Sequence, residues 1–320
     1  MAKRIYSSIA DLVGRTPLLS LGEFSRQKKL DVPIVAKVEY FNPAGSQKDR
    51  IALGMIERAE KDPSFDPKKT TLVETTSGNT GIALAALCAA KGYKLRIYIQ
   101  DVVSIERRQV IKAYGADLVL FSQVPEAVKV LKETNGDFVA ATAAIKKMAA
   151  KEKDAILLNQ MQNPANPESH FKTTGREIWK DTGGDIDVLV ASVGTGGTLS
   201  GAGRFLKNKK PDMHVVAVQP RADETDITGV HRFSDVPSDH FPANLDRSVY
   251  DEVLTASAKD AYAASRLVAK TDGLLVGSSA GAALWAAAKV AKRPDFAGKT
   301  VLAILPDTGL RYLSTSLFEA

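Results

Sequence analysis

Lys48 follows a turn that joins a short apolar run to a helical pattern. The run at 34–38 is typical of a buried strand, and Ile51, Met55 and Ile56 recur at helical spacing beyond the turn. A lysine in the first turn of a helix meets the positive end of the helix dipole, which disfavours the protonated ammonium. The free amine is a nucleophile for carbonyl groups, so Lys48 is a candidate for imine formation. The alternative is an ordinary solvated lysine.

The start of this helix carries a second pattern. Ser46 is followed three residues later by Asp49, which resembles a capping box that uses the shorter acid. In such a box each of the two side chains accepts a hydrogen bond from the other residue's backbone N–H. We therefore expect the helix to begin near Ser46 and to contain Lys48 in its first turn.

Two further turns carry groups that bind anions. Residues 74–81, Glu-Thr-Thr-Ser-Gly-Asn-Thr-Gly, end a strand pattern and open a helical one, so hydroxyls and free backbone N–H groups meet at a helix N-terminus. That arrangement suits a carboxylate or a phosphate. Residues 194–198, Gly-Thr-Gly-Gly-Thr, let backbone N–H groups converge on a phosphate because few side chains stand in the way. Each segment, taken alone, is also compatible with a plain turn that binds nothing.

Several classes of protein are disfavoured by the same motifs. Leu199 stands where a dinucleotide fingerprint needs its last glycine, so the 194–198 turn favours a small phosphate-bearing ligand over a nucleotide. Residues 277–281 match the nucleophile elbow of serine hydrolases, but all four histidines precede Ser279, and that class needs one after it. The single cysteine, Cys88, excludes an internal disulfide and multi-cysteine zinc sites, and we expect it to be a small buried core residue. No metal site is predicted.

The overall charge raises the question of nucleic acid, since the net charge is +6 and the isoelectric point is near 9.2. The lysine clusters at 146–153 and 207–210 are not interleaved with exposed aromatic residues that stack on bases, so we predict no nucleic-acid partner. No apolar run approaches the roughly 20 residues that cross a bilayer. The first residues lack the apolar core of a signal peptide, and a cytoplasmic protein without a membrane partner is the default expectation.

The order of patterns along the chain predicts an α/β protein. Predicted strands at 71–74, 93–100, 117–121, 155–158, 187–193, 214–219 and 301–305 alternate with predicted helices at 80–91, 104–114, 136–153, 166–180, 199–208, 258–270 and 280–291. Continuous apolar strands between helices favour parallel sheets that are covered on both faces. Ligands should then bind at the carboxyl ends of the strands. The segment 221–246 is irregular, and an irregular segment of that length is usually functional.

Together, a lysine at one helix start, a carboxylate site at a second and a phosphate site at a third indicate a Schiff-base enzyme. Its cofactor would be pyridoxal 5'-phosphate and its substrates amino acids. The motifs at 42–50, 76–81, 194–198 and 277–281 resemble, in this order, those of the cysteine synthase and cystathionine β-synthase family. These are fold-type II pyridoxal phosphate enzymes, similar to the β subunit of tryptophan synthase.

The resemblance implies a fold and a set of residue roles. It implies two lobes with open, mostly parallel twisted sheets covered by helices: a smaller mobile substrate-binding lobe at 45–157, and a larger cofactor-binding lobe from 1–44 and 158–320. Lys48 would hold the cofactor covalently and act as the base at the substrate Cα, and Ser279 would face an unprotonated pyridine nitrogen. Asn79 would bind the ring oxygen of the cofactor; Gly194, Thr195, Gly196, Gly197 and Thr198 would bind its phosphate; and Thr76, Ser77, Thr80 and Gln160 would bind the substrate carboxylate.

This sequence departs from the family in two places. Relatives usually have a glycine-rich segment where this chain has 227–242, which has lost most of the glycines and gained ionisable groups. Asp235 or His231 could there activate water or protonate a hydroxyl leaving group, and Asp235 is predicted as a second catalytic residue. Alternatively, these side chains face solvent. Gln47 stands where the family often has a small apolar residue.

The predicted function is β-replacement that forms cysteine from an activated serine, most simply O-acetylserine, and sulfide. One alternative is desulfhydration of cysteine, which releases hydrogen sulfide with L-serine as co-product. Another is a serine-using reaction of the cystathionine β-synthase type. A non-enzymatic alternative is a regulatory binding protein on the same fold, although the presence of Lys48 argues against it. The family also implies a homodimer.

Overall fold

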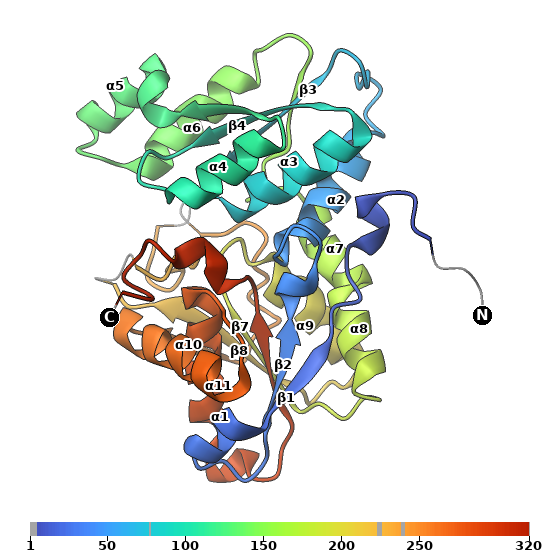
Figure 1. Ribbon diagram of the computed structural model, residues 1–320, viewed down its shortest axis with the longest axis vertical. Coiled ribbons are helices and arrows are strands. Elements are labelled where there is room, and N and C mark those ends of the chain that lie inside the picture. Colours follow the sequence, from blue (N-terminus) through green and yellow to red (C-terminus); the bar gives the residue numbers. More distant parts are fainter. Residues whose placement is uncertain (1–4, 77, 223–225, 238–240, 320) are drawn as a thin grey trace.

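The structure is a computed structural model that describes residues 5–76, 78–222, 226–237 and 241–319. These residues form two sheets, one above the other in Figure 1. The larger sheet has the order β1 (Leu18–Leu21), β2 (Ile34–Val38), β10 (Val301–Leu305), β7 (Val188–Ser192), β8 (His214–Pro220) and β9 (Glu252–Ala256). The smaller has the order β5 (Asp117–Leu120), β4 (Lys94–Ile99), β3 (Thr71–Thr76) and β6 (Ala155–Leu157). Within the described chain all neighbours are parallel except β1 and β2, which confirms the predicted α/β class.

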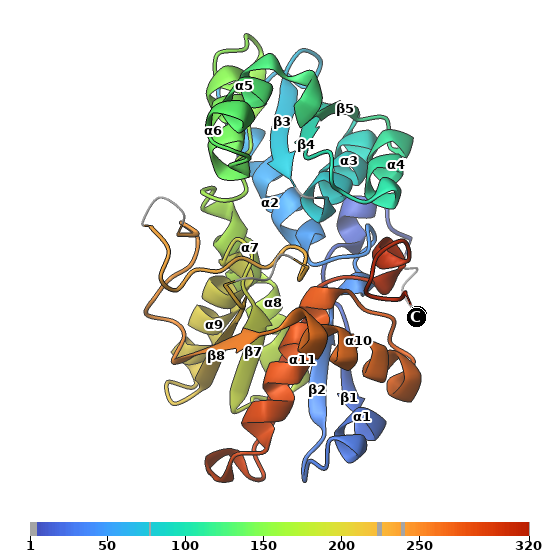
Figure 2. The ribbon, with the colours of Figure 1, turned by 90° about the vertical axis from the view of Figure 1, so that its left-hand side faces the viewer.

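Both faces of the larger sheet are buried. Val188 and Val190 of β7 point into one apolar cluster, and Leu189 and Ala191 point into another on the opposite face. Helices α1 (Gly22–Gln27), α10 (Ala258–Asp272) and α11 (Ser278–Ala291) complete the first cluster, while α8 (Thr174–Asp181) and α9 (Gly197–Lys209) complete the second, with α7 (Ala165–Lys172) packed on α9 (Figure 2). The burial of both faces explains why the strands are apolar throughout.

The smaller sheet is covered in the same way. Leu72 of β3 and Ile97 of β4 pack with α2 (Lys48–Ala59), α3 (Asn79–Lys91) and α4 (Ile105–Ala113). Val73 and Tyr98, the next residues of the two strands, pack with α5 (Pro125–Glu133) and α6 (Phe138–Ala149) on the other face. Every element of this group falls within 45–157, but the exact lobe boundaries and the mobility of the lobe stay predictions.

Several predicted elements differ from the structure. The helix expected at 166–180 is two helices, because the backbone of Thr173 leaves the helical region (φ −120°, ψ −74°) and its hydroxyl donates to the carbonyl oxygen of Ser169 at 2.6 Å. The helix expected at 136–153 is shorter, since Asp137 caps it and it ends at Ala149. Among the described strands and α-helices, β1, α1, α5 and β9 were not predicted from the sequence, and all but α5 have six residues or fewer.

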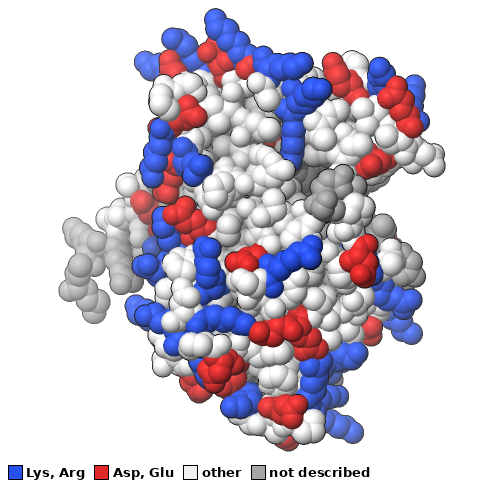
Figure 3. Space-filling view, turned by 180° about the vertical axis from the view of Figure 1, so that it is seen from behind, with Lys and Arg blue, Asp and Glu red and all other residues white. Residues whose placement is uncertain are grey.

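The remaining expectations concern single features. Cys88 is buried in the core of α3, where burial raises the pKa of its thiol to about 12. The described parts of 221–246 contain no helix or strand, as predicted. None of the described helices is long and apolar enough to cross a membrane. On the face shown in Figure 3, basic and acidic side chains alternate rather than forming a continuous basic stripe.

Candidate active site

A cavity of about 630 Å³ lies between the two sheets. Its wall includes residues at the ends of β3, β6, β7 and β10 or within a few positions after them, so it is situated at the carboxyl ends of strands from both sheets. This is the position expected for a ligand site in a parallel α/β protein. Lys48, Asn79, Gly194 and Ser279, which come from four separate motifs, all line it.

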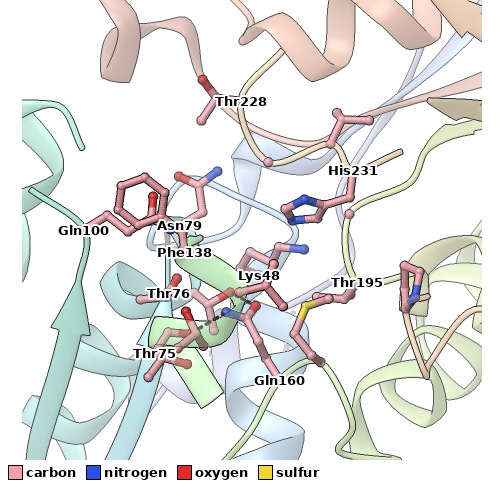
Figure 4. A pocket seen from close by; sticks show the side chains of 18 of the residues that line it. Lys48, Thr75, Thr76, Asn79, Gln100, Phe138, Gln160, Thr195, Thr228 and His231 are labelled. Carbon is pink, nitrogen blue, oxygen red and sulfur yellow. Dashed lines mark hydrogen bonds between the residues drawn. The ribbon is translucent and has the colours of Figure 1, made fainter. Parts of the chain in front are cut away.

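Lys48 is the first residue of α2, and its amine points into the cavity (Figure 4). Burial lowers the pKa of this amine to about 8, although the carboxylate of Asp307 acts in the opposite direction. An amine with a lowered pKa has a larger unprotonated fraction at neutral pH than an exposed lysine. It is therefore suited both to bind a carbonyl carbon and to accept a proton.

The helix start itself differs from the predicted capping box. The hydroxyl of Ser46 accepts from the backbone N–H of Lys48 at 3.2 Å, and Asp49 accepts from the backbone N–H of Ala44 at 2.6 Å. Asp49 thus reaches back across the turn rather than to Ser46, and Gln47 precedes the helix without a side-chain cap. The capping box was wrong, but the place of Lys48 in the first helical turn is confirmed.

Ion pairs hold α2 against the larger sheet. Arg50 donates to Glu39, which directly follows β2, at 2.7 Å, and to Glu177 of α8 at 2.7 Å. Arg50 and Glu39 are fully buried, so the guanidinium and its carboxylates compensate one another out of water. This pairing fixes the first turn of α2, and with it Lys48, relative to the larger sheet.

A network of hydrogen bonds from residues that follow β10 orients Asn79, the first residue of α3. The amide nitrogen of Asn79 donates to Asp307 at 2.7 Å, and its amide oxygen accepts from Arg311 at 2.6 Å. The hydroxyl of Tyr312 also donates to Asp307 at 2.7 Å. Because both ends of the amide are held, its orientation is set before any ligand binds. Sequence reasoning missed Asp307, although a polar residue just after a predicted strand was a usable signal.

The turn after β3 brings hydroxyls to the N-terminus of α3. Thr80 donates to Gln160 at 2.6 Å. Gln160 in turn donates to the carbonyl oxygen of Thr75 at 3.2 Å, and Figure 4 shows these two side by side. Thr76 accepts from the N–H of Gly78 at 3.1 Å. The predicted carboxylate residues Thr76, Thr80 and Gln160 therefore lie together, while Ser77 lies outside the described residues.

Gly78 has a conformation that other residues rarely adopt. Its φ is 138°, and a Cβ there would clash with the side chain of Arg107. Arg107 comes from α4 and lies over the ring of Tyr312, with 4.6 Å between its Cζ and the ring centroid. A glycine is thus required where the smaller sheet meets the segment after β10.

The 194–198 turn joins β7 to α9, whose N-terminus carries free backbone N–H groups. A Cβ at Gly194 would clash with the carbonyl oxygen of Gly229, and one at Gly197 would clash with Asn166. Gly196 has φ 84° and precedes the helix. The amide of Asn166 donates to the hydroxyl of Thr195 at 2.9 Å. The turn is therefore a tight cradle formed mainly by backbone.

Gln47 and His170, whose roles were not predicted from the sequence, complete this cradle. Thr198 donates to the amide oxygen of Gln47 at 3.0 Å, and its hydroxyl lies 3.1 Å from Nε2 of His170. His170 is buried, and burial lowers the pKa of its imidazole to about 3, so the ring is neutral. Gln47 directly precedes Lys48, and this hydrogen bond links it to the start of α9. The contact gives the polar side chain of Gln47 a structural reason.

Ser279 is the second residue of α11, and its backbone carbonyl accepts from the hydroxyl of Ser192 at 2.7 Å. It is buried at the cavity wall and brings a neutral hydroxyl there. The preceding residue, Ser278, accepts from the N–H of Thr228 at 3.1 Å, which ties the irregular segment to α11.

The irregular segment separates the two ionisable residues that were named in it. His231 lines the cavity, and its backbone N–H donates to the carbonyl oxygen of Val193 at 2.8 Å. Asp235 does not line the cavity; its side chain is 81% exposed and pairs with Arg232 at 3.1 Å. The structure therefore does not support a catalytic role for Asp235, because the segment turns its carboxylate toward solvent.

Comparison with known proteins agrees with this geometry. Residues 9–307 match the profile of a family described as pyridoxal-phosphate dependent enzymes. The chain belongs to this family. A cysteine synthase of Staphylococcus aureus (strain N315) is 42% identical over 100% of this chain and 99% of its own length.

Two solved structures in the same comparison are also similar over nearly the whole chain. The cysteine synthase of Entamoeba histolytica has a TM-score of 0.85 at 35% identity, covering 99% of this chain and 92% of its own. A hydrogen sulfide-producing enzyme of Fusobacterium nucleatum has a TM-score of 0.82 at 35% identity, covering 97% of this chain and 99% of its own. The fold-type II architecture expected from the sequence is thereby confirmed.

The cavity residues fit the cofactor of this family, pyridoxal 5'-phosphate. The glycine cradle and the N-terminus of α9 are suited to its phosphate, since side chains are excluded there and N–H groups are free. Lys48 provides the amine that its carbonyl needs, and Asn79 and Ser279 provide polar groups for its ring. When bound, the cofactor supplies the electron sink that makes the Cα proton of an amino acid acidic.

Proposed function

We propose that the chain catalyses β-replacement on an activated serine, with O-acetylserine and sulfide as substrates and cysteine as product. The observation that carries this proposal is the convergence of three groups on one cavity: the amine of Lys48, the phosphate cradle before α9 and the hydroxyl-rich N-terminus of α3. The similarity to cysteine synthases over the full chain supports the choice of substrates.

Each group has a defined task in this reaction. Thr76, Thr80 and Gln160 bind the substrate carboxylate at the N-terminus of α3, where the helix dipole and hydroxyls favour an anion. Lys48 accepts the Cα proton, which its lowered pKa permits at neutral pH, and returns the proton at the end. Asn79 keeps the cofactor ring in place because Asp307 and Arg311 hold its amide from both sides.

A second candidate function is desulfhydration of cysteine, which releases hydrogen sulfide and gives serine when water is added. The observation that favours it is the titratable imidazole of His231 in the cavity, together with the similarity to the hydrogen sulfide-producing enzyme. A serine-using reaction of the cystathionine β-synthase type is a third candidate, since a group that activates water in one direction assists a hydroxyl leaving group in the other.

The candidates differ in their products. The purified protein with pyridoxal phosphate is given O-acetylserine with sulfide, cysteine alone, or serine with homocysteine, and products are identified by mass spectrometry and a sulfide assay. Cysteine from the first mixture, with little change in the other two, is the expected result. Sulfide and serine from cysteine alone would instead give desulfhydration first place, and cystathionine from the last mixture would do the same for the third candidate.

We also propose that the protein is a cytoplasmic homodimer. Exposed apolar side chains on and after the first strands, among them Leu19 and Phe41, support burial against a second copy. Light scattering coupled to size-exclusion chromatography tests this, and a mass near the 34.3 kDa of one chain would contradict it.

A further inference from the structure

The imidazole of His231 lies in the cavity without an assigned task. Figure 4 shows its ring beside the amine of Lys48, on the opposite side of that amine from Gln160. Its ring forms no hydrogen bond with any residue that the structure describes. A polar ring that lines a substrate cavity and has no hydrogen-bond partner among the described residues is available to the substrate.

The backbone around His231 is fixed from several sides. Ile227 and Val230 are buried in the core of the larger sheet. The N–H of Thr228 donates to Ser278 at 3.1 Å, and Gln219 accepts from the N–H of Phe233 at 3.1 Å. Together with the bond from its own N–H to Val193, just after β7, these contacts hold His231 at a defined position over the cavity.

The charges around the ring favour its neutral form. Desolvation inside the cavity and, to a smaller extent, the ammonium of Lys48 from α2 lower the pKa of His231, although the residue as a whole remains accessible through the open cavity. The neighbouring Arg232 pairs with the exposed Asp235. A neutral imidazole has a free nitrogen lone pair, so it is suited to accept a proton rather than to donate one.

We propose that His231 is the general base for the nucleophile that adds to the substrate Cβ. This inference rests on the proposed β-replacement. As the sulfur of hydrogen sulfide or a thiol bonds to Cβ, the S–H bond breaks and its proton moves to the imidazole nitrogen, while Lys48 returns the Cα proton. The imidazolium then releases its proton to water. The balance is one O-acetylserine and one hydrogen sulfide to cysteine, acetate and one proton.

The two proton positions of the reaction explain why two bases are needed. Lys48 serves the Cα position and holds a proton when the nucleophile arrives, so it is not free to accept a second one. His231 serves the nucleophile. It therefore matters for nucleophiles that carry a proton at the pH of the reaction, and not for those that are already ionised.

The experiment compares two thiols in the wild-type holoenzyme and in His231→Gln, each with O-acetylserine as partner. One thiol, 2-mercaptoethanol, is protonated near pH 7, and the other, 5-thio-2-nitrobenzoate, is ionised. We expect the variant to lose about 10²-fold in kcat/KM with the protonated thiol. The loss with the ionised thiol should stay within about threefold, because no proton needs to be removed. His214→Gln, which replaces a histidine at the amino end of β8, is the matched control and should change neither rate.

A second measurement does not depend on turnover. In the wild-type holoenzyme labelled with ¹⁵N-histidine, the ring signals that disappear in His231→Gln belong to His231. We expect this ring to be neutral at pH 7 and to titrate below the ordinary range of histidine. A ring that is protonated at pH 7 would overturn the inference.

The outcomes distinguish the inference from the proposed function. Equal losses with both thiols would mean that His231 only maintains the structure, and the inference would fail while β-replacement stands. A wild-type enzyme that converts O-acetylserine with neither thiol nor sulfide would remove the proposed function itself. The pattern that supports both is turnover in the wild type and a selective loss in His231→Gln.

Discussion

The turns at 74–81 and 194–198 share a layout, in which a parallel strand is followed by a helix N-terminus, but their surroundings differ. Around 194–198, a Cβ on Gly194 would meet backbone and one on Gly197 a buried amide, so the cradle has one shape. Around 74–81, some of the contacts join two side chains, such as Thr80 with Gln160, and a rotation of χ angles can change them. The difference suits a cofactor that stays bound and a substrate that enters and leaves at each turnover.

Lys48 lies between the two turns, and its loss should affect both the cofactor and the substrate. We expect Lys48→Ala to lower kcat/KM for cysteine formation by about 10³-fold or more, since both the covalent attachment and the base at Cα are removed. Product formation and the visible absorption of the imine measure the two effects separately. Lys151→Ala, at an exposed position, is the control and should leave both unchanged. Full activity in Lys48→Ala would contradict the assignment.

The rigid shape of the cradle predicts a large effect of a single methyl group. In Gly197→Ala the new Cβ clashes with Asn166, which also holds Thr195, so the cradle must shift. A cost of about 1–3 kcal/mol would weaken binding of pyridoxal phosphate by roughly 10- to 100-fold. Equilibrium dialysis of the reconstituted protein measures it. Gly22→Ala, where a Cβ meets nothing within 4 Å, should bind the cofactor normally.

A matched pair of hydroxyl deletions sharpens the comparison. Thr80→Val should raise KM for O-acetylserine by about tenfold and leave cofactor affinity unchanged, because one hydrogen bond at the carboxylate site is lost. Thr198→Val should weaken the binding of pyridoxal phosphate and leave KM for O-acetylserine unchanged, since the hydroxyl of Thr198 bonds to Gln47 and His170 beside the cradle. If both variants changed the same parameter, the division of tasks between the two turns would be wrong.

The last prediction concerns the stability of the folded chain in acid and not its activity. The folded pKa of His170, about 3, lies below the unfolded value of about 6.5, so the unfolded chain binds a proton that the folded chain does not between these pH values. The free energy of unfolding is therefore unaffected by His170 above pH 6.5 and decreases as the pH falls toward 3, at up to about 1.4 kcal/mol per pH unit. Denaturant unfolding of His170→Gln should therefore show a shallower decline over this range.

The residues of the site that the sequence predicted are those whose role follows from local pattern. Lys48, 76–81, 194–198 and 277–281 each join a strand pattern to a helix pattern or start a helix, and parallel strands bring such turns to one edge. The α/β class followed from the same alternation. Their meeting in one cavity is thus a consequence of topology.

The rest depends on contacts between distant parts of the chain. Asn79 and Asp307 are 228 positions apart, and Gln47 and Thr198 are 151 apart, so no local pattern connects them. The predicted capping box is absent because the carboxylate of Asp49 accepts from the backbone N–H of Ala44 and not from that of Ser46. The sequence indicates ionisable groups in the 227–242 loop but not which of them faces the cavity. In the structure His231 lines it and the side chain of Asp235 faces solvent.

The position of β10 has a consequence for synthesis of the protein. This strand lies in the middle of the larger sheet, between β2 and β7, yet it comes after β2, β7, β8 and β9 in the chain, and Asp307 and Arg311 follow it. The smaller sheet, made of 71–157, can pair while the ribosome is still adding residues, because all its strands are then available. The larger sheet cannot close until β10 has been made. We therefore expect a chain that stops before β10 to form the small sheet beside an open large one, without the hydrogen bonds from Asp307 and Arg311 that hold Asn79.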